Sequence, residues 1–223
     1  MRFRALLAAV LATGALVTSV GTAAADDKPA PSTASTIAVI GDTPYGDPAL
    51  ARFPSDVAKI NGDPDVSLVA HLGDIKNGSS VCSDSYFSQI RSIFDTFQDP
   101  LVYTPGDNEW TDCHRASAGG FLPTERLDKI RQDFFPVPGQ TLGVNKTQVQ
   151  SQNNGSHPYV ENTMFSQSGV VFSAVNLPGS NNDLVPWFGV TPLTEGQQRE
   201  FENRQEADLE WIDKAFENAR ENK

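Results

Sequence analysis

Three aspartates are spaced in the sequence so that they could bind a metal together. Asp42, Asp74 and Asp107 each follow a glycine at the end of a short apolar run, at spacings of 32 and 33 residues. A single aspartate in such a place often caps a helix. A cap needs only one carboxylate, however, whereas several carboxylates held at one edge repel each other and raise each other's pKa. A divalent cation relieves this repulsion, so we predict a metal site.

The apolar runs before the aspartates are typical of buried strands that alternate with helices. Strands are expected at residues 36–40, 66–70 and 101–103, and helices at 48–60 and 84–97, where apolar residues recur at helical spacing. This order predicts right-handed crossovers and a parallel sheet, hence an α/β fold. Because the carboxyl ends of parallel strands share one edge of a sheet, all three aspartates are expected there.

The second half of the chain has a less regular pattern. We expect a helix at residues 125–135 and surface loops at 140–157 and 179–198, because polar residues dominate the loops. Two strand-like runs, Tyr159 to Gln167 and Gly169 to Asn176, predict a β-hairpin. A final amphipathic helix is expected from about Arg199 to Glu221.

The glycine–aspartate motifs resemble those of a known family. Gly41-Asp42, Gly73-Asp74 with Asn77-Gly78, and Gly106-Asp107-Asn108-Glu109 are similar to the first three motifs of calcineurin-like metallophosphoesterases, in order and in spacing. The resemblance implies the N-terminal portion of a four-layer αββα sandwich with a mostly parallel sheet. It also implies a dinuclear metal centre that hydrolyses phosphate esters of small substrates with a metal-bound hydroxide.

Carried over residue by residue, the resemblance assigns a role to each aspartate. Asp42 would bind the first metal, Asp74 would bridge both metals, and Asp107 would bind the second metal in place of the family's asparagine. A carboxylate has two oxygens and can hold two cations about 3.5–4 Å apart. The resemblance implies two divalent or trivalent ions, of manganese, iron or zinc.

The sequence also departs from the family pattern. Pro44 stands where the family has a histidine ligand, and Asn108 stands where it has a histidine that assists the leaving group. An amide is a poor proton donor, although Asn108 can still hydrogen-bond a phosphate oxygen. We consider His114 for the vacant acid role, against the alternative of a solvated loop residue, and we expect Glu109 to orient a metal ligand. For His71, a histidine satisfied within the fold is the favoured interpretation.

No counterpart of the family's later histidine motifs follows Asn176, and the chain closes within a helical pattern. We therefore expect a C-terminally incomplete domain, which would bind metal weakly and turn over little. An alternative hypothesis is a non-catalytic exported protein that binds a single cation, such as calcium, at the carboxylate edge, because ligation by oxygen alone suits hard cations.

The N-terminus and the cysteines predict export. Residues 1–25 have the layout of a bacterial secretory signal, with two arginines, a mostly apolar stretch and a small-residue cleavage site. We expect a flexible lead-in at 26–35 and the phosphoesterase domain at 36–223. The apolar stretch is too short for a stable membrane anchor. In an oxidising compartment the only two cysteines, Cys82 and Cys113, are expected to form a disulfide.

Net charge excludes one class of partner. The chain has 17 Lys and Arg against 28 Asp and Glu, a formal charge of −11, and removal of residues 1–25 would change it to 15 − 28 = −13. Such an acidic chain has no basic surface for phosphate backbones, so we expect no nucleic-acid partner. The same charge would repel a phosphorylated substrate unless bound metal reverses it locally.

Overall fold

The structure is a computed structural model that describes residues 35–153 and 158–221, all within the compact unit Thr33–Lys223. The predicted export signal at 1–25, nearly all of the predicted lead-in and His157 lie outside the described residues. No helix among the described residues combines the length and the apolar character needed to cross a membrane.

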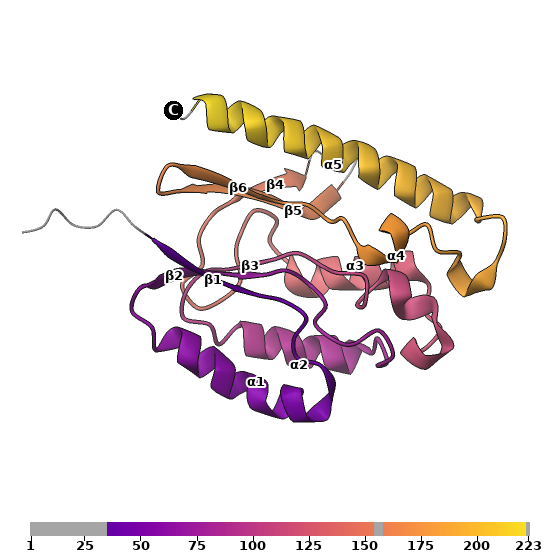
Figure 1. The fold of residues 1–223 in the computed structure, drawn as a ribbon, viewed down its shortest axis with the longest axis horizontal. Coiled ribbons are helices and arrows are strands. Elements are labelled where there is room, and N and C mark those ends of the chain that lie inside the picture. Colours follow the sequence, from indigo (N-terminus) through magenta and orange to yellow (C-terminus); the bar gives the residue numbers. More distant parts are fainter. Residues whose placement is uncertain (1–34, 154–157, 222–223) are drawn as a thin grey trace, which may run out of the picture. The chain divides into compact units, whose positions relative to one another are not determined.

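The first half of this unit is a parallel sheet with crossover helices (Figure 1). Its elements in chain order are β1 (Thr36–Ile40), α1 (Gly46–Asn61), β2 (Val66–His71), α2 (Asp84–Phe94) and β3 (Leu101–Tyr103). The strands are parallel in the order β1-β2-β3, and Ile40, His71 and Tyr103 lie in register. The carboxyl ends of all three strands are therefore level, as the sequence predicts.

Aromatic packing fixes the helices against this sheet. Ser83 is the N-cap residue of α2, because its hydroxyl accepts a hydrogen bond from the Tyr86 N–H at 3.2 Å. Phe94 of α2 is fully buried and contacts the rings of Phe53 on α1 and Tyr103 on β3. Helix α3 (Pro123–Phe134) adds Leu127, Ile130 and Phe134 to the same buried interior.

A second sheet is antiparallel and includes one strand that the sequence did not predict. It contains β4 (Gln150–Asn153), β5 (Pro158–Gln167) and β6 (Val170–Ala174), and β5 and β6 form the expected hairpin. The prediction of a surface loop throughout 140–157 was wrong for β4. The strand β4 was not predicted because its sequence is polar. Its Gln152 side chain is nevertheless buried, and it donates to the Ala207 carbonyl oxygen at 2.7 Å.

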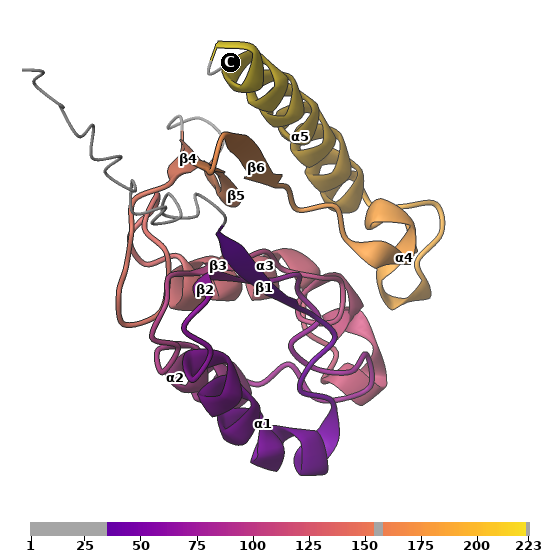
Figure 2. The same ribbon diagram turned by 60° about the vertical axis from the view of Figure 1, so that its left-hand side comes forward.

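Helix α5 (Glu195–Glu221) packs against β5 and β6. The views in Figures 1 and 2 agree that α1 and α2 lie on one side of the parallel sheet, while the antiparallel sheet and then α5 lie on the other. This is the layer order of the expected αββα sandwich, so the predicted α/β fold class is confirmed. Trp211 of α5 is buried, but Leu209 and Phe216 are exposed, so the predicted apolar face is only partly buried.

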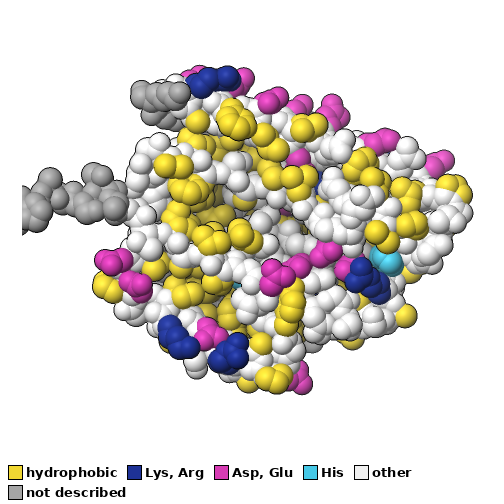
Figure 3. Space-filling view, viewed as in Figure 1, with side chains coloured by type: hydrophobic (Ala, Val, Ile, Leu, Met, Phe, Trp, Pro, Cys, Tyr) yellow, Lys and Arg dark blue, Asp and Glu magenta, His cyan; other side chains and the backbone are white. Residues whose placement is uncertain are grey.

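An apolar cleft separates the inner faces of the two sheets. Its volume is about 390 Å³, and its lining includes Val39 and Leu72 from the parallel sheet and Phe165 and Phe172 from the antiparallel sheet. Figure 3 shows this hollow as a gathering of hydrophobic side chains. The two sheets therefore do not close on each other over this part of their faces.

Candidate active site

Glycines allow the loops after the parallel strands to approach one another. A Cβ added to Gly73 would lie 2.2 Å from the Gly106 backbone nitrogen, and a Cβ added to Gly106 would lie 2.1 Å from Asp74 Oδ1. Gly73 also has a φ of +85°, in the left-handed region that favours glycine. The glycine before each of Asp74 and Asp107 is thus needed so that the two loops can touch.

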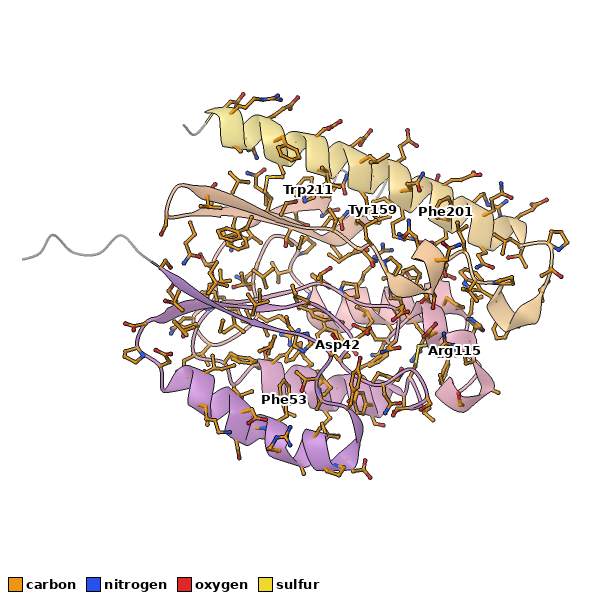
Figure 4. The ribbon with its side chains drawn as sticks, in the orientation of Figure 1. Asp42, Phe53, Arg115, Tyr159, Phe201 and Trp211 are labelled. Carbon is orange, nitrogen blue, oxygen red and sulfur yellow. A yellow bond between two sulfur atoms is a disulfide. The ribbon has the colours of Figure 1, made fainter. Side chains whose placement is uncertain are left out.

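The Tyr45 hydroxyl lies where three loops meet, and the sequence analysis did not single it out. Its oxygen lies 2.9 Å from Asp42 Oδ1 and 3.2 Å from Asp74 Oδ2, and it accepts a hydrogen bond from Asn108 Nδ2 at 3.1 Å. Burial and the two neighbouring carboxylates raise the pKa of Tyr45 far above its ordinary value. Two predicted metal ligands and the Asn108 amide therefore converge on one oxygen atom (Figure 4, where Asp42 is labelled).

Asp74 is a carboxylate with a strongly raised pKa at this edge. Burial and then the negative charges of Asp107 and Asp42 raise its pKa to about 6, although the Asn108 backbone N–H, which donates to Asp74 Oδ1 at 3.2 Å, opposes the rise. Like charges close to a carboxylate favour its protonated form, and a cation would restore the ionised form. The raised pKa of Asp74 is therefore due first to burial and then to the negative charges of Asp107 and Asp42.

Asp107 faces a different part of the chain from Asp42 and Asp74. Its Oδ2 lies 3.1 Å from Ser180 Oγ, and a Cβ added to Gly179 would come within 2.3 Å of the same oxygen. Within residues 35–153 and 158–221 no three His, Cys, Asp or Glu side chains are grouped closely enough to hold one metal ion. The structure thus pairs Asp42 with Asp74 and places Asp107 within electrostatic range, while the sharing of metals by all three stays a prediction.

Glu109 is buried and holds the backbone around Asp74. Its Oε1 accepts hydrogen bonds from the Asp74 N–H at 3.1 Å, the Gly106 N–H at 2.8 Å and the Tyr103 hydroxyl at 2.8 Å. Its Oε2 is also buried and has no hydrogen-bond partner among the described residues. Burial, followed by the charge of Asp74, raises the pKa of Glu109 to about 7. These contacts fix the backbone at Asp74 and Gly106, while the role of Glu109 in orienting a metal ligand stays a prediction.

A disulfide and a buried lysine join the loops after β2 and β3. Cys82 and Cys113 are bonded, which confirms the predicted pair. Lys76 is also buried, and its Nζ donates to the Asn108 carbonyl oxygen at 2.6 Å. Burial lowers the pKa of Lys76 to about 8, although the nearby charges of Glu109 and Asp112 oppose this change. The backbone that carries Asn108 is therefore held by covalent and polar contacts.

Neither described histidine contacts the paired carboxylates. His71 is buried; its Nδ1 accepts from the Gly73 N–H at 3.2 Å, so its Nε2 carries the proton and donates to the Thr43 carbonyl oxygen at 3.0 Å. Burial lowers the pKa of His71 to about 4, which fits a neutral histidine satisfied within the fold. His114 Nδ1 accepts from the Phe188 N–H at 3.2 Å, and burial lowers its pKa.

The residues that converge here offer oxygen rather than nitrogen ligands. Asp42, Asp74 and Tyr45 each bring an oxygen to one point, and the amide of Asn108 can turn its own oxygen toward it. Such a donor set suits a hard divalent cation. The residues present therefore fit a metal between Asp42 and Asp74, without the imidazole ligands of the family pattern.

Comparison with known proteins identifies the family. No curated protein and no solved structure gives a significant match. A family model described as calcineurin-like phosphoesterase matches residues 35–220, which span both sheets and every loop of the candidate site. With its parallel sheet and the carboxylates at the carboxyl ends of the strands, the chain belongs to the calcineurin-like phosphoesterase family.

Proposed function

We propose that this chain is a secreted metal-dependent phosphoesterase that hydrolyses esters of phosphate at the edge where β1, β2 and β3 end. The observation that carries the proposal is the meeting of Asp42, Asp74 and the Asn108 amide at the Tyr45 hydroxyl. Membership of the calcineurin-like phosphoesterase family supports metal-dependent phosphoester hydrolysis in general.

The chain's own residues would have separate tasks in this reaction. Asp42 and Asp74 would hold a first metal, Asp74 and Asp107 a second, and these ions would supply positive charge and an acidified water. Glu109 keeps the Asp74 backbone in place through the hydrogen bond at 3.1 Å. The Asn108 amide can donate to a phosphoryl oxygen, which leaves the proton donor for the leaving group to be sought at His114.

We also propose that residues 36–223 belong to one phosphoesterase domain that follows an export signal at 1–25 and a lead-in at 26–35. The disulfide between Cys82 and Cys113 supports an oxidising destination, because cytosolic conditions keep most thiols reduced.

A non-catalytic cation-binding protein is the second candidate function. It is favoured by one observation: the side chains of Asp42 and Asp74 that meet at the Tyr45 hydroxyl offer oxygen atoms alone. A single hard cation such as calcium would then bind at the oxygen atoms around Tyr45, without turnover.

Asp74→Asn tests both candidates, with Asp128→Asn as a matched control because the Asp128 side chain is 69% exposed. Hydrolysis of an aryl phosphate would be measured with and without added manganese or zinc, and metal binding would be measured by calorimetry. We expect Asp74→Asn to lose at least about a hundredfold in metal-supported turnover, since even partners of metal ligands cost 10–100-fold.

The two candidate functions give different outcomes in this experiment. Equal turnover by Asp74→Asn and the wild type would refute the proposed enzyme site. Metal binding that depends on Asp74, together with no turnover of any aryl ester by the wild type, would favour the cation-binding protein.

A further inference from the structure

Arg115 is an exposed cationic side chain held in place by a buried carboxylate. It follows the short turn Thr111–His114, and its Nη1 lies 2.6 Å from Asp112 Oδ2. The Asp112 side chain is 3% exposed, whereas that of Arg115 is 43% exposed. A guanidinium has five N–H donors in a planar fork. Nη1 is therefore anchored by Asp112, while the side chain as a whole remains partly exposed to solvent.

The anchored guanidinium lies beside the Asn108 amide. A Cβ added to Gly78 would lie 2.8 Å from Asn108 Oδ1 and 3.0 Å from Arg115 Nη1, so both groups border the space left by this glycine. Figure 3 shows a row of acidic side chains on this face that ends at basic and histidine side chains. Figure 4, in the same orientation, labels Asp42 and Arg115 at the two ends of this row.

A hydroxyl links Arg115 to the third aspartate. Ser180 Oγ accepts from Arg115 Nη2 at 3.5 Å, and it lies 2.6 Å from Asp112 Oδ1 and 3.1 Å from Asp107 Oδ2. Arg115 is thus one hydrogen-bonded atom away from a predicted metal ligand. The Lys76 ammonium is also near but is buried, so it cannot reach a ligand in solvent.

We propose that Arg115 binds a non-ester oxygen of the substrate's phosphoryl group and that the site therefore takes phosphate monoesters in preference to diesters. This inference rests on the proposed function. A monoester has three non-ester oxygens and carries a charge of about −1.5 to −2 at neutral pH, whereas a diester has two such oxygens and a single charge. Two oxygens can face the metals, so only a monoester presents a third charged oxygen to the guanidinium, whose fork matches phosphate geometry.

Arg115→Met tests this inference, with Arg199→Met as a matched control. Arg199 is an exposed arginine in an ion pair with Glu195 on α5. Inorganic phosphate binding to the metal-loaded protein would be measured by calorimetry, and kcat/KM would be measured for p-nitrophenyl phosphate and for bis-p-nitrophenyl phosphate. Metal binding and the melting temperature of each variant would be measured alongside.

We expect Arg115→Met to weaken phosphate binding and monoester kcat/KM by about tenfold to a hundredfold, the effect of one charge-assisted contact. The diester kcat/KM and metal binding should change less than about threefold, and Arg199→Met should change nothing. If the loss of the Asp112 partner unfolds Arg115→Met, Arg115→Lys keeps the charge without the fork and should show an intermediate loss.

The inference and the proposed function fail on different results. Three results would each overturn the inference and leave the proposed phosphoesterase activity intact. They are an unchanged phosphate affinity in a folded Arg115→Met, an equal loss of kcat/KM for both esters, and a wild-type preference for the diester. If the wild type with manganese or zinc hydrolyses neither ester, the proposed function fails, and the monoester assignment fails with it.

Discussion

Replacement of Glu109 by glutamine should change how stability depends on pH. The Glu109 carboxyl group is fully buried beside Asp74, and its pKa rises from an ordinary 4.5 to about 7. Glutamine has nearly the same shape and can keep the acceptor oxygen that serves the N–H groups of Asp74 and Gly106, but it cannot titrate. The variant thus removes one proton equilibrium and preserves the packing.

The expected size follows from these two pKa values. Between 4.5 and 7 the folded chain binds more protons at Glu109 than the unfolded chain, so the free energy of unfolding falls as pH rises. The stabilisation is fully present below the unfolded pKa and is lost above the folded one. Linkage gives ~2.6 kcal/mol at pH 5 and nearly nothing at pH 8, hence a loss of ~2.5 kcal/mol between them.

Urea unfolding of the metal-free protein in EDTA at these two pH values measures the effect. Other groups titrate over the same range, so the relevant quantity is the change in the wild type minus the change in Glu109→Gln. Glu206→Gln, on the exposed surface of α5, should follow the wild type. If the wild type and Glu109→Gln lose the same stability within ~0.5 kcal/mol, Glu109 does not hold the excess proton and this reasoning fails.

Two further predictions concern the loops around the site. Gly106→Ala should destabilise the protein by ~1–3 kcal/mol and weaken metal binding, because the new Cβ would lie 2.1 Å from Asp74 Oδ1. The control Gly196→Ala, where the Cβ meets only ordinary contacts, should be neutral or stabilising in the same denaturation and calorimetry experiments. Equal effects of the two substitutions would contradict the steric argument. Reduction of the Cys82–Cys113 disulfide should lower the free energy of unfolding by ~3–4 kcal/mol, because the bond closes a loop that spans 31 residues. Urea titrations with and without reductant measure the loss, and an unchanged midpoint with two free thiols would refute the prediction.

The parallel half of the fold was predictable because its signals are local. The strands β1 and β3 have the predicted bounds, since each is a short apolar run followed by a turn. Helix α1 begins two residues before the predicted Pro48 and continues through Pro54. Its buried Phe53 and Val57 explain why packing holds the helix despite the proline.

Elements stabilised by distant partners were harder to predict. The strand β4 is polar, and the burial of Gln152 depends on the Ala207 carbonyl, 55 residues along the chain. Helix α5 begins at Glu195 rather than at the predicted Arg199, and here the missed signal was a local one. Thr194 Oγ1 accepts a hydrogen bond from the Gln197 N–H at 3.2 Å, an N-cap contact that the threonine and the following glutamate could have indicated.

The candidate site likewise contains residues that local patterns indicate and residues that come from distant parts of the chain. That Asp42 and Asp74 lie near each other was predictable from their places after strands, and Tyr45 could have been added because it lies three residues after Asp42 in the same loop. Ser180 could not, because it contacts Asp107 from 73 residues away through a turn with left-handed φ angles at Ser180 and Asn181, labelled α4 (Gly179–Asn182) in Figure 1. Such contacts depend on how the two halves of the unit pack, and no short pattern encodes them.

The bond between Cys82 and Cys113 spans the loops that carry Gly78, Asn108 and Arg115. Any ligand that requires these loops in their ordered arrangement must bind the oxidised chain more tightly than the reduced one. Thermodynamic reciprocity then demands that the bound ligand make the bond harder to reduce by the same free energy. Occupancy of the proposed phosphate site and survival of the disulfide would in this way be coupled, so that each protects the other.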